Sequence, residues 1–149
     1  MAEPTPEFLR ELLGSVLEDS AFLLAEPVEE RPGFEGSVLL ARIAFESMRG
    51  GTLQLLTTPE GATEIAANML GIEPGEEARS SGRAAVSELL NVLGGSFLIR
   101  YFGAAVPSQL GLPTSQVLSA WPGAPRGCAA AVRLESGAPL VLELDLEER

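Results

Sequence analysis

Residues 78–102 constrain the fold most, because their apolar side chains recur with helical spacing and their polar side chains share the opposite face. At about 100° of turn per residue, one face collects the large apolar side chains of Val86, Leu90, Leu93 and Phe97. The other face carries Ala84, Glu88, Asn91 and Gly95. The pattern predicts a long helix, stopped by Gly103, that turns a carboxylate and a carboxamide outward.

Two further helices are predicted from capping residues and spacing. Thr5 and Pro6 suit the N-cap and first position of a helix that runs to about residue 25, where Pro27 ends it. A shorter helix opens at residues 58–59 and closes at Gly71. In the long helix, residues 94–95 are both glycine, and each costs about 1 kcal/mol relative to alanine. We expect close packing, a bend or an approach site there, and packing is the commonest of these reasons.

Alternating segments predict the strands. Residues 37–46 place Leu39, Ala41, Ile43 and Phe45 on one face, and a turn at 49–51 leads into a second strand at 52–57, which gives an antiparallel hairpin. Further strands are predicted at 114–120, 129–134 and 140–146, and irregular segments at 29–34, 107–113 and 121–125. The length of 149 residues and a hydrophobic fraction of 46% fit one domain, 1–149, in which residues 1–5 form a flexible tail.

Composition excludes several kinds of chemistry. The chain has no histidine and no lysine, so Ser-His-Asp and Cys-His catalysis, histidine metal sites, Schiff bases and Walker-type phosphate binding are ruled out within it. Cys128 is the single cysteine, and a small buried hydrophobe is a commoner role for it than a reactive thiol. A net charge of −11 disfavours nucleic acid and anionic membranes as partners. No apolar run approaches the ~18 residues that span a bilayer, so we expect a cytoplasmic protein.

The run Glu88-x-x-Asn91-x-x-x-Gly95, inside an otherwise apolar helix, resembles the signature of the CheC/CheX/FliY chemotaxis phosphatases, and its single occurrence is similar to CheX. The surrounding order agrees: an N-terminal helix that contains residues 17–22, a strand pair, two helices and further strands. The resemblance implies an α/β (α+β) domain with a CheC-like fold, in which a mainly antiparallel sheet packs against long helices. One position departs from the family pattern, since Asp or Ser usually stands four residues before the Glu and this chain has Ala84.

The resemblance also implies a function, the hydrolysis of the phospho-aspartate of a CheY-like response-regulator receiver domain. Asn91 would orient the attacking water and Glu88 would dock onto the partner, while Ala84, Ser87 and Gly95 would contact it. The receiver brings its own lysine and divalent cation, Mg²⁺, to stabilise the transferring phosphoryl group. The chain would therefore need no cofactor or metal of its own. The family further suggests a homodimer.

Two alternatives without catalysis stay open. Ala84 favours a CheX-like binding or dimerisation module that has lost activity, and a flagellar-switch scaffold of the FliN/FliM type is the other. Retention of both Glu88 and Asn91 counts against each, although an exposed glutamate is ordinarily just a solvated residue. Leu98 and Phe102 are expected near the motif face, where they would form part of a partner surface or be covered by the chain's own strands.

Overall fold

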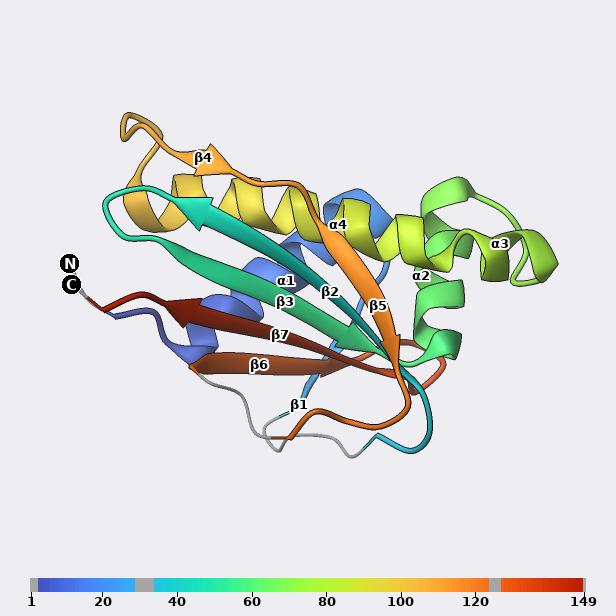
Figure 1. The fold of residues 1–149 in the computed structure, drawn as a ribbon. Coiled ribbons are helices and arrows are strands. Elements are labelled where there is room, and N and C mark those ends of the chain that lie inside the picture. Colours follow the sequence, from blue (N-terminus) through green and yellow to red (C-terminus); the bar gives the residue numbers. More distant parts are fainter. Residues whose placement is uncertain (1–2, 29–33, 124–126, 149) are drawn as a thin grey trace.

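The structure is a computed structural model that describes residues 3–28, 34–123 and 127–148. Its strands form one sheet in the order β1-β6-β7-β3-β2-β4, with β5 also paired to β2, and the pairings are antiparallel. The helices lie on one face of this sheet (Figure 1), which confirms the predicted α+β class. The elements are α1 (Pro6–Ala21), β1 (Glu26–Val28), β2 (Val38–Glu46), β3 (Gly51–Thr57), α2 (Pro59–Leu70), α3 (Glu76–Ser80), α4 (Gly82–Phe97), η1 (Leu98–Phe102), β4 (Gln109–Leu110), β5 (Thr114–Leu118), β6 (Cys128–Arg133) and β7 (Pro139–Leu146).

Helix α1 begins as the sequence predicts and ends earlier. Thr5 caps it by accepting a 3.1 Å hydrogen bond from the amide of Phe8. It stops at Ala21 rather than near residue 25, because Phe22 adopts a left-handed conformation (φ 54°) that cannot continue a helix. Pro27 lies in the short edge strand β1, which the sequence analysis missed, at a position where the absence of an amide N–H is tolerated.

The central hairpin places its apolar residues against the helices. β2 and β3 pair in register from Leu39 opposite Thr57 to Phe45 opposite Gly51. The core residues of β2 include the four that alternation predicts: Leu39, Ala41, Ile43 and Phe45. The strands predicted at 114–120, 129–134 and 140–146 are present as β5, β6 and β7 with ends shifted by one or two residues. β4 falls in the segment predicted as irregular, because a two-residue strand shows no alternation.

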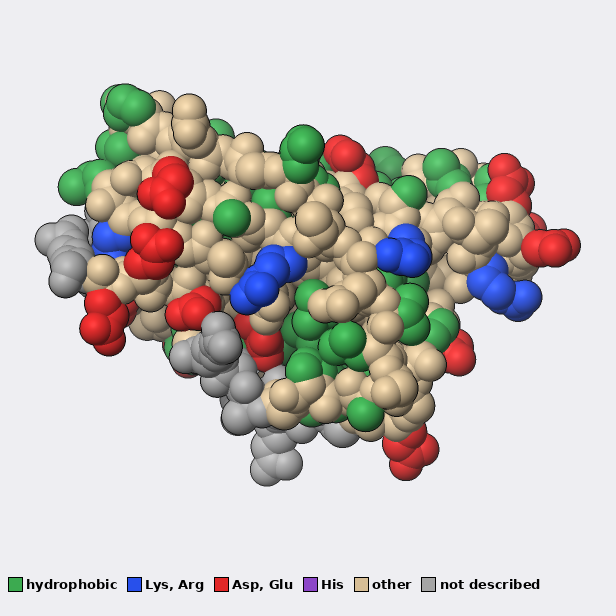
Figure 2. Space-filling view, in the orientation of Figure 1, with side chains coloured by type: hydrophobic (Ala, Val, Ile, Leu, Met, Phe, Trp, Pro, Cys, Tyr) green, Lys and Arg blue, Asp and Glu red, His purple; other side chains and the backbone are tan. Residues whose placement is uncertain are grey.

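The helices leave the other face of the sheet uncovered, and Figure 2 shows the molecule from that side. A second hydrophobic cluster lies there, formed by Val38, Leu40, Leu56, Ala131 and Val141. The rings of Phe34 and Trp121 pack onto it and stack on each other at 4.0 Å. Acidic side chains gather toward the opposite end of the same face, over the ends of β2, β3 and β7 (Figure 2).

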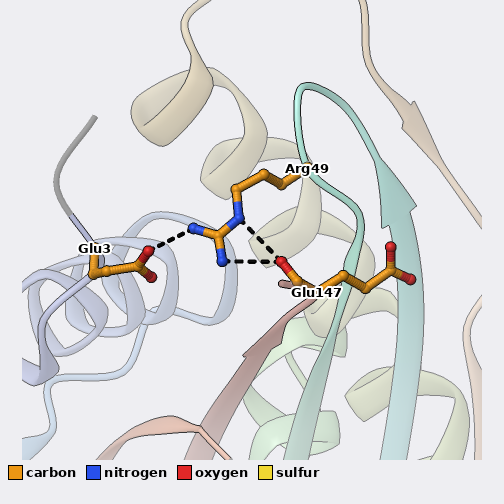
Figure 3. A network of polar contacts seen from close by, with 3 residues as sticks. All are labelled: Glu3, Arg49 and Glu147. Atoms are coloured by element: carbon orange, nitrogen blue, oxygen red, sulfur yellow. Dashed lines mark hydrogen bonds and ion pairs between the residues drawn. The ribbon is translucent and has the colours of Figure 1, made fainter. Parts of the chain in front are cut away.

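Arg49, in the turn between β2 and β3, holds both ends of the described chain (Figure 3). Its guanidinium donates hydrogen bonds of 2.9 and 3.1 Å to the backbone carbonyl of Glu147 and forms a 2.7 Å ion pair with Glu3. Of the predicted flexible tail, residues 1–2 lie outside the described residues, and Glu3 and Thr5 make the contacts given above. The mobility of this segment therefore stays a prediction.

Cys128 fits the structural role expected for it. The side chain is half-buried at the start of β6 and packs against the core. Desolvation raises the pKa of its thiol, and the nearby Glu7 carboxylate raises that pKa further, so the thiolate that would act as a nucleophile is disfavoured. Among the residues described, no helix combines the length and the apolar character needed to cross a bilayer.

Candidate functional site

The motif residues lie on α4, which is shorter than the single helix predicted at 78–102. The stretch divides at Ser81, whose backbone (φ −94°, ψ 0°) departs from α-helical values, so α3 ends at Ser80 and α4 starts at Gly82. A Cβ on Gly82 would lie 3.1 Å from the Cβ of Ala62 in α2, which is tighter than ordinary contact. Close packing between the two helices therefore fixes the first turn of α4.

One face of α4 presents every residue of the predicted site to the outside. Ala84, Glu88 and Asn91 are exposed, and Ser87 and Gly95 are half-exposed. The side chains of Glu88 and Asn91 form no hydrogen bond or ion pair with another described residue. The predicted core side chains of the opposite face are fully buried: Val86, Leu90, Leu93 and Phe97. The core thus holds the helix rigidly while the carboxylate and the carboxamide remain free for a partner.

The adjacent glycines of α4 differ in what surrounds them. A Cβ on Gly94 would lie 2.7 Å from Cδ1 of Leu110, so this glycine allows β4 to pack on the helix. A Cβ on Gly95 would meet no atom within 4 Å. Packing, the reason expected for the glycine pair, therefore applies to Gly94. At Gly95 the backbone of the motif face is open to approach from outside the molecule.

The arginines of α4 and η1 form hydrogen bonds with other residues and do not neutralise the charge of Glu88. Arg83 donates a 2.7 Å hydrogen bond to the carbonyl of Ser115 and a 3.2 Å hydrogen bond to its hydroxyl, which ties α4 to β5. Arg100, in η1, donates a 3.0 Å hydrogen bond to the hydroxyl of Ser15 in α1. The negative charge of Glu88 is therefore available to a cationic group on another molecule.

A π-helical turn after α4 changes which apolar side chains lie beside the site. Leu98 and Phe102, expected near the motif face, are only 7% and 6% exposed and belong to the core, so the rest of the chain covers them and they form no partner surface. A π-helical turn holds more residues than an α-helical turn, so each residue advances by less than about 100° and Phe102 rotates toward the core. Its ring packs there at 6.3 Å from Phe45. Ile99, which is 58% exposed, takes the place beside the motif face.

The motif face is the outer surface of a helix rather than a cleft. A hollow of about 460 Å³ lies elsewhere, across the ends of β2, β3 and β4, and its lining includes Phe45, Thr52 and Gln109 but neither motif residue. Among the described residues, no three His, Cys, Asp or Glu side chains lie together so that they could hold a metal ion. The surface around Asn91 thus offers one carboxylate and one carboxamide, and a partner would supply any further reacting group.

The segment that runs beside the site has no signal in the sequence that predicts its place there. β4 and β5, with the residues between them, pass along α4 (Figure 1), where Leu110 packs on Gly94 and Ser115 binds Arg83. Leu112, between these two contacts, is 88% exposed. A leucine between a glycine and a proline in an irregular segment carries no periodic signal, so spacing could not have placed its segment beside α4.

Comparison with known proteins yields matches among solved structures. A chain of the CheX–CheY complex of Borrelia burgdorferi, determined with BeF₃ and Mg²⁺, matches with a TM-score of 0.71 and 16% identity, over 97% of this chain and 99% of that one. CheX of Vibrio vulnificus matches with a TM-score of 0.68 and 19% identity, over 93% of each chain. The FliM middle domain of Vibrio alginolyticus is more distant, with a TM-score of 0.53 and 12% identity over 95% and 93% of the two chains. No family model matches this sequence, and no curated protein matches it.

These matches establish the fold. The chain has the mixed helix and antiparallel-sheet fold of CheX and CheC-like chemotaxis proteins, as the resemblance of its motif predicts. Each match spans more than nine-tenths of both chains, so the whole domain and not one substructure is shared.

Proposed function

We propose that this chain, which has a CheX-like fold, accelerates hydrolysis of the phospho-aspartate of a CheY-type receiver domain. The observation that carries the proposal is the exposure of Glu88 and Asn91, one turn apart on a helix whose other face is buried, with no bonds to other described residues. Because the buried face fixes the backbone of α4, both side chains project from a defined position and only their own rotamer freedom is lost on docking.

In the proposed reaction, the carboxamide of Asn91 both donates to and accepts from one water and holds it in line with the phosphorus. The water oxygen bonds to phosphorus as the bond from phosphorus to the aspartyl oxygen breaks. The aspartate leaves as a carboxylate, and the proton of the water ends on the released inorganic phosphate. The cation and lysine of the receiver stabilise the charge that is transferred, so this chain needs no titrating group for the step.

Glu88 has a separate role in the proposal. Its carboxylate pairs with a cationic group of the receiver and sets the angle at which Asn91 enters the phosphorylated site. Ala84, Ser87 and Gly95 lie on the same face and contact the receiver around this pair.

A receiver-binding module without catalytic activity is the second candidate. Ala84 supports it, because no polar side chain stands where the family usually has Asp or Ser. The fold shared with the middle domain of FliM is also compatible with it. Both candidates use the same face of α4, so turnover and not binding separates them. A homodimer and a cytoplasmic location belong to the proposal as well, and analytical ultracentrifugation tests the first.

The proposal is tested by following loss of the phosphoryl group from purified CheY-type receivers of the source organism, phosphorylated with acetyl phosphate. Substoichiometric amounts of the chain should shorten the lifetime of at least one phosphorylated receiver. A chain that binds a phosphorylated receiver without shortening its lifetime would favour the second candidate.

A further inference from the structure

We infer that Leu112 is a partner-binding residue that contacts an apolar patch of the receiver domain beside its phosphorylated aspartate. The inference rests on the proposed function and extends it from the helix to a second element. The segment between β4 and β5, which lies outside the motif, would then help to recognise the receiver.

Two contacts fix this segment along α4. Leu110, at the end of β4, fills the space above Gly94, and Ser115, in β5, accepts hydrogen bonds from Arg83. Gly94 and Arg83 lie about 20° apart around the helix axis when each residue turns by about 100°. The segment therefore follows one side of α4 and runs in the opposite direction to the helix.

Simple lengths then place Leu112 at the level of the motif. The helix between the two contacts is about 16 Å long at 1.5 Å per residue, and residues 110–115 span about the same distance when extended at 3.3 Å per residue. Leu112, two steps beyond Leu110, thus lies level with the helical turn that carries Ser87 and Asn91. Around the axis, Asn91 lies between Glu88 and this segment.

The leucine is held in position and yet uncovered. Its backbone neighbour Gly111 donates a 2.8 Å hydrogen bond to the carbonyl of Ala44 in β2, which fixes the segment to the sheet. The side chain of Leu112 is 88% exposed, and Ile99 adds a second exposed apolar side chain beyond the end of α4. Single exposed apolar residues are common on protein surfaces. The distinguishing feature here is an anchored backbone at the level of the helical turn that carries the proposed water-positioning amide.

The geometry commits this surface to the receiver. Any domain that brings its phospho-aspartate to Asn91 must cover the residues within one turn of it on both sides. On one side Glu88 meets a cationic group. On the other side residues 110–115, Leu-Gly-Leu-Pro-Thr-Ser, carry no charge in a chain whose net charge is −11. An uncharged, apolar region of the receiver fits there, and the contact excludes water from the charged centre of the interface.

The test combines kinetics and binding for Leu112→Asp, Leu112→Met and the control Met48→Asp. Met48 is 59% exposed in the turn between β2 and β3, outside the segment 110–115, and its replacement changes the net charge equally. KM and kcat are measured with the receiver phosphorylated by acetyl phosphate, and Kd with the same receiver carrying BeF₃⁻ and Mg²⁺. Leu112→Asp should raise KM and Kd at least tenfold and leave kcat within about twofold. Leu112→Met and Met48→Asp should match the wild type.

The outcomes separate this inference from the proposed function. If the wild type is active and Leu112→Asp has the same KM and Kd as the wild type, the inference is overturned and the proposed function stands. Equal weakening by Met48→Asp also overturns it, because a general charge effect would then explain the loss. If the wild type binds a receiver without turnover, the proposed function is overturned. The Kd of Leu112→Asp compared with that of the wild type then tests whether Leu112 binds the receiver. A wild type that neither binds nor hydrolyses any receiver overturns both.

Discussion

Leu110 occupies the space that a side chain on Gly94 would need, with its Cδ1 only 2.7 Å from the position of that Cβ. The neighbouring Gly95 has no atom within 4 Å of the corresponding point. Two glycines that look equivalent in the sequence therefore serve different surfaces. Gly94 lets the strand segment lie against the motif helix, and Gly95 leaves the outer surface of that helix open.

This difference predicts opposite effects of the same substitution. Gly95→Ala should stabilise the fold by about 0.5–1 kcal/mol, because alanine removes the cost of a glycine in a helix and meets no neighbour. Gly94→Ala should be less stable than Gly95→Ala by about 1–2 kcal/mol, since Leu110 must move away. Urea unfolding of the two variants and the wild type measures both effects. Equal stability of the two variants would mean that Leu110 does not pack on Gly94.

Arg49 and Glu3 form an ion pair, but we expect Arg49 to contribute more than Glu3 to the free energy of unfolding. The Arg49 side chain is 12% exposed and binds the carbonyl of Glu147 twice, whereas Glu3 is 70% exposed. Arg49→Ala should lower the free energy of unfolding by about 1–2 kcal/mol. Glu3→Ala should change it by less than about 0.5 kcal/mol, the usual value for an exposed pair. Similar losses in both variants would show that the ion pair, and not the carbonyl contact, stabilises this corner.

Glu88 should affect binding more than folding. Glu88→Ala should weaken the complex with a BeF₃⁻-bound receiver and slow turnover, because the cationic group of the receiver loses its partner. Glu88→Gln should retain part of the affinity through hydrogen bonding. Glu77→Ala, at an exposed glutamate of α3, is the matched control and should bind as the wild type does. Isothermal titration of the three variants checks this, and unchanged affinity in Glu88→Ala would identify Glu88 as an ordinary surface residue.

Ala84 bears on whether the chain is an active enzyme. Alanine is the best helix former, so it leaves the positions of Glu88 and Asn91 intact and removes one polar contact at most. We expect the wild type to be active and Ala84→Ser to change receiver affinity by no more than about 1 kcal/mol, the scale of one net hydrogen bond. Parallel phosphatase assays of the wild type and Ala84→Ser test this expectation. An inactive wild type that serine rescues would show that this position is essential and that the chain as it stands is no phosphatase.

The sequence predicted the parts of the site that depend on helical spacing. Glu88, Asn91 and Ala84 share an exposed face because residues three and four apart always do on a helix. Spacing could not predict the π-helical turn, since its wider geometry depends on how Phe102 packs in the core. For this reason regular spacing places Phe102 on the wrong side of the helix.

The parts of the fold that were missed depend on contacts between distant residues. β1 and β4 are strands of three and two residues that exist because they pair with β6 and β2. Their own residues carry too little alternation to predict them. The segment that contains Leu112 lies along α4 through the contacts of Leu110 and Arg83, which join positions far apart in the chain. Local patterns contain no information about such pairs.

The most direct test of the central claim is the dephosphorylation rate of a receiver in the presence of Asn91→Ala. If Asn91 positions the water, this variant should fold and bind a BeF₃⁻-bound receiver as the wild type does but lose at least about 100-fold in kcat. Asn68→Ala, at the other asparagine of the chain, is the control and should keep full activity. A folded Asn91→Ala protein with turnover near that of the wild type would contradict the assignment of Asn91 and the mechanism built on it.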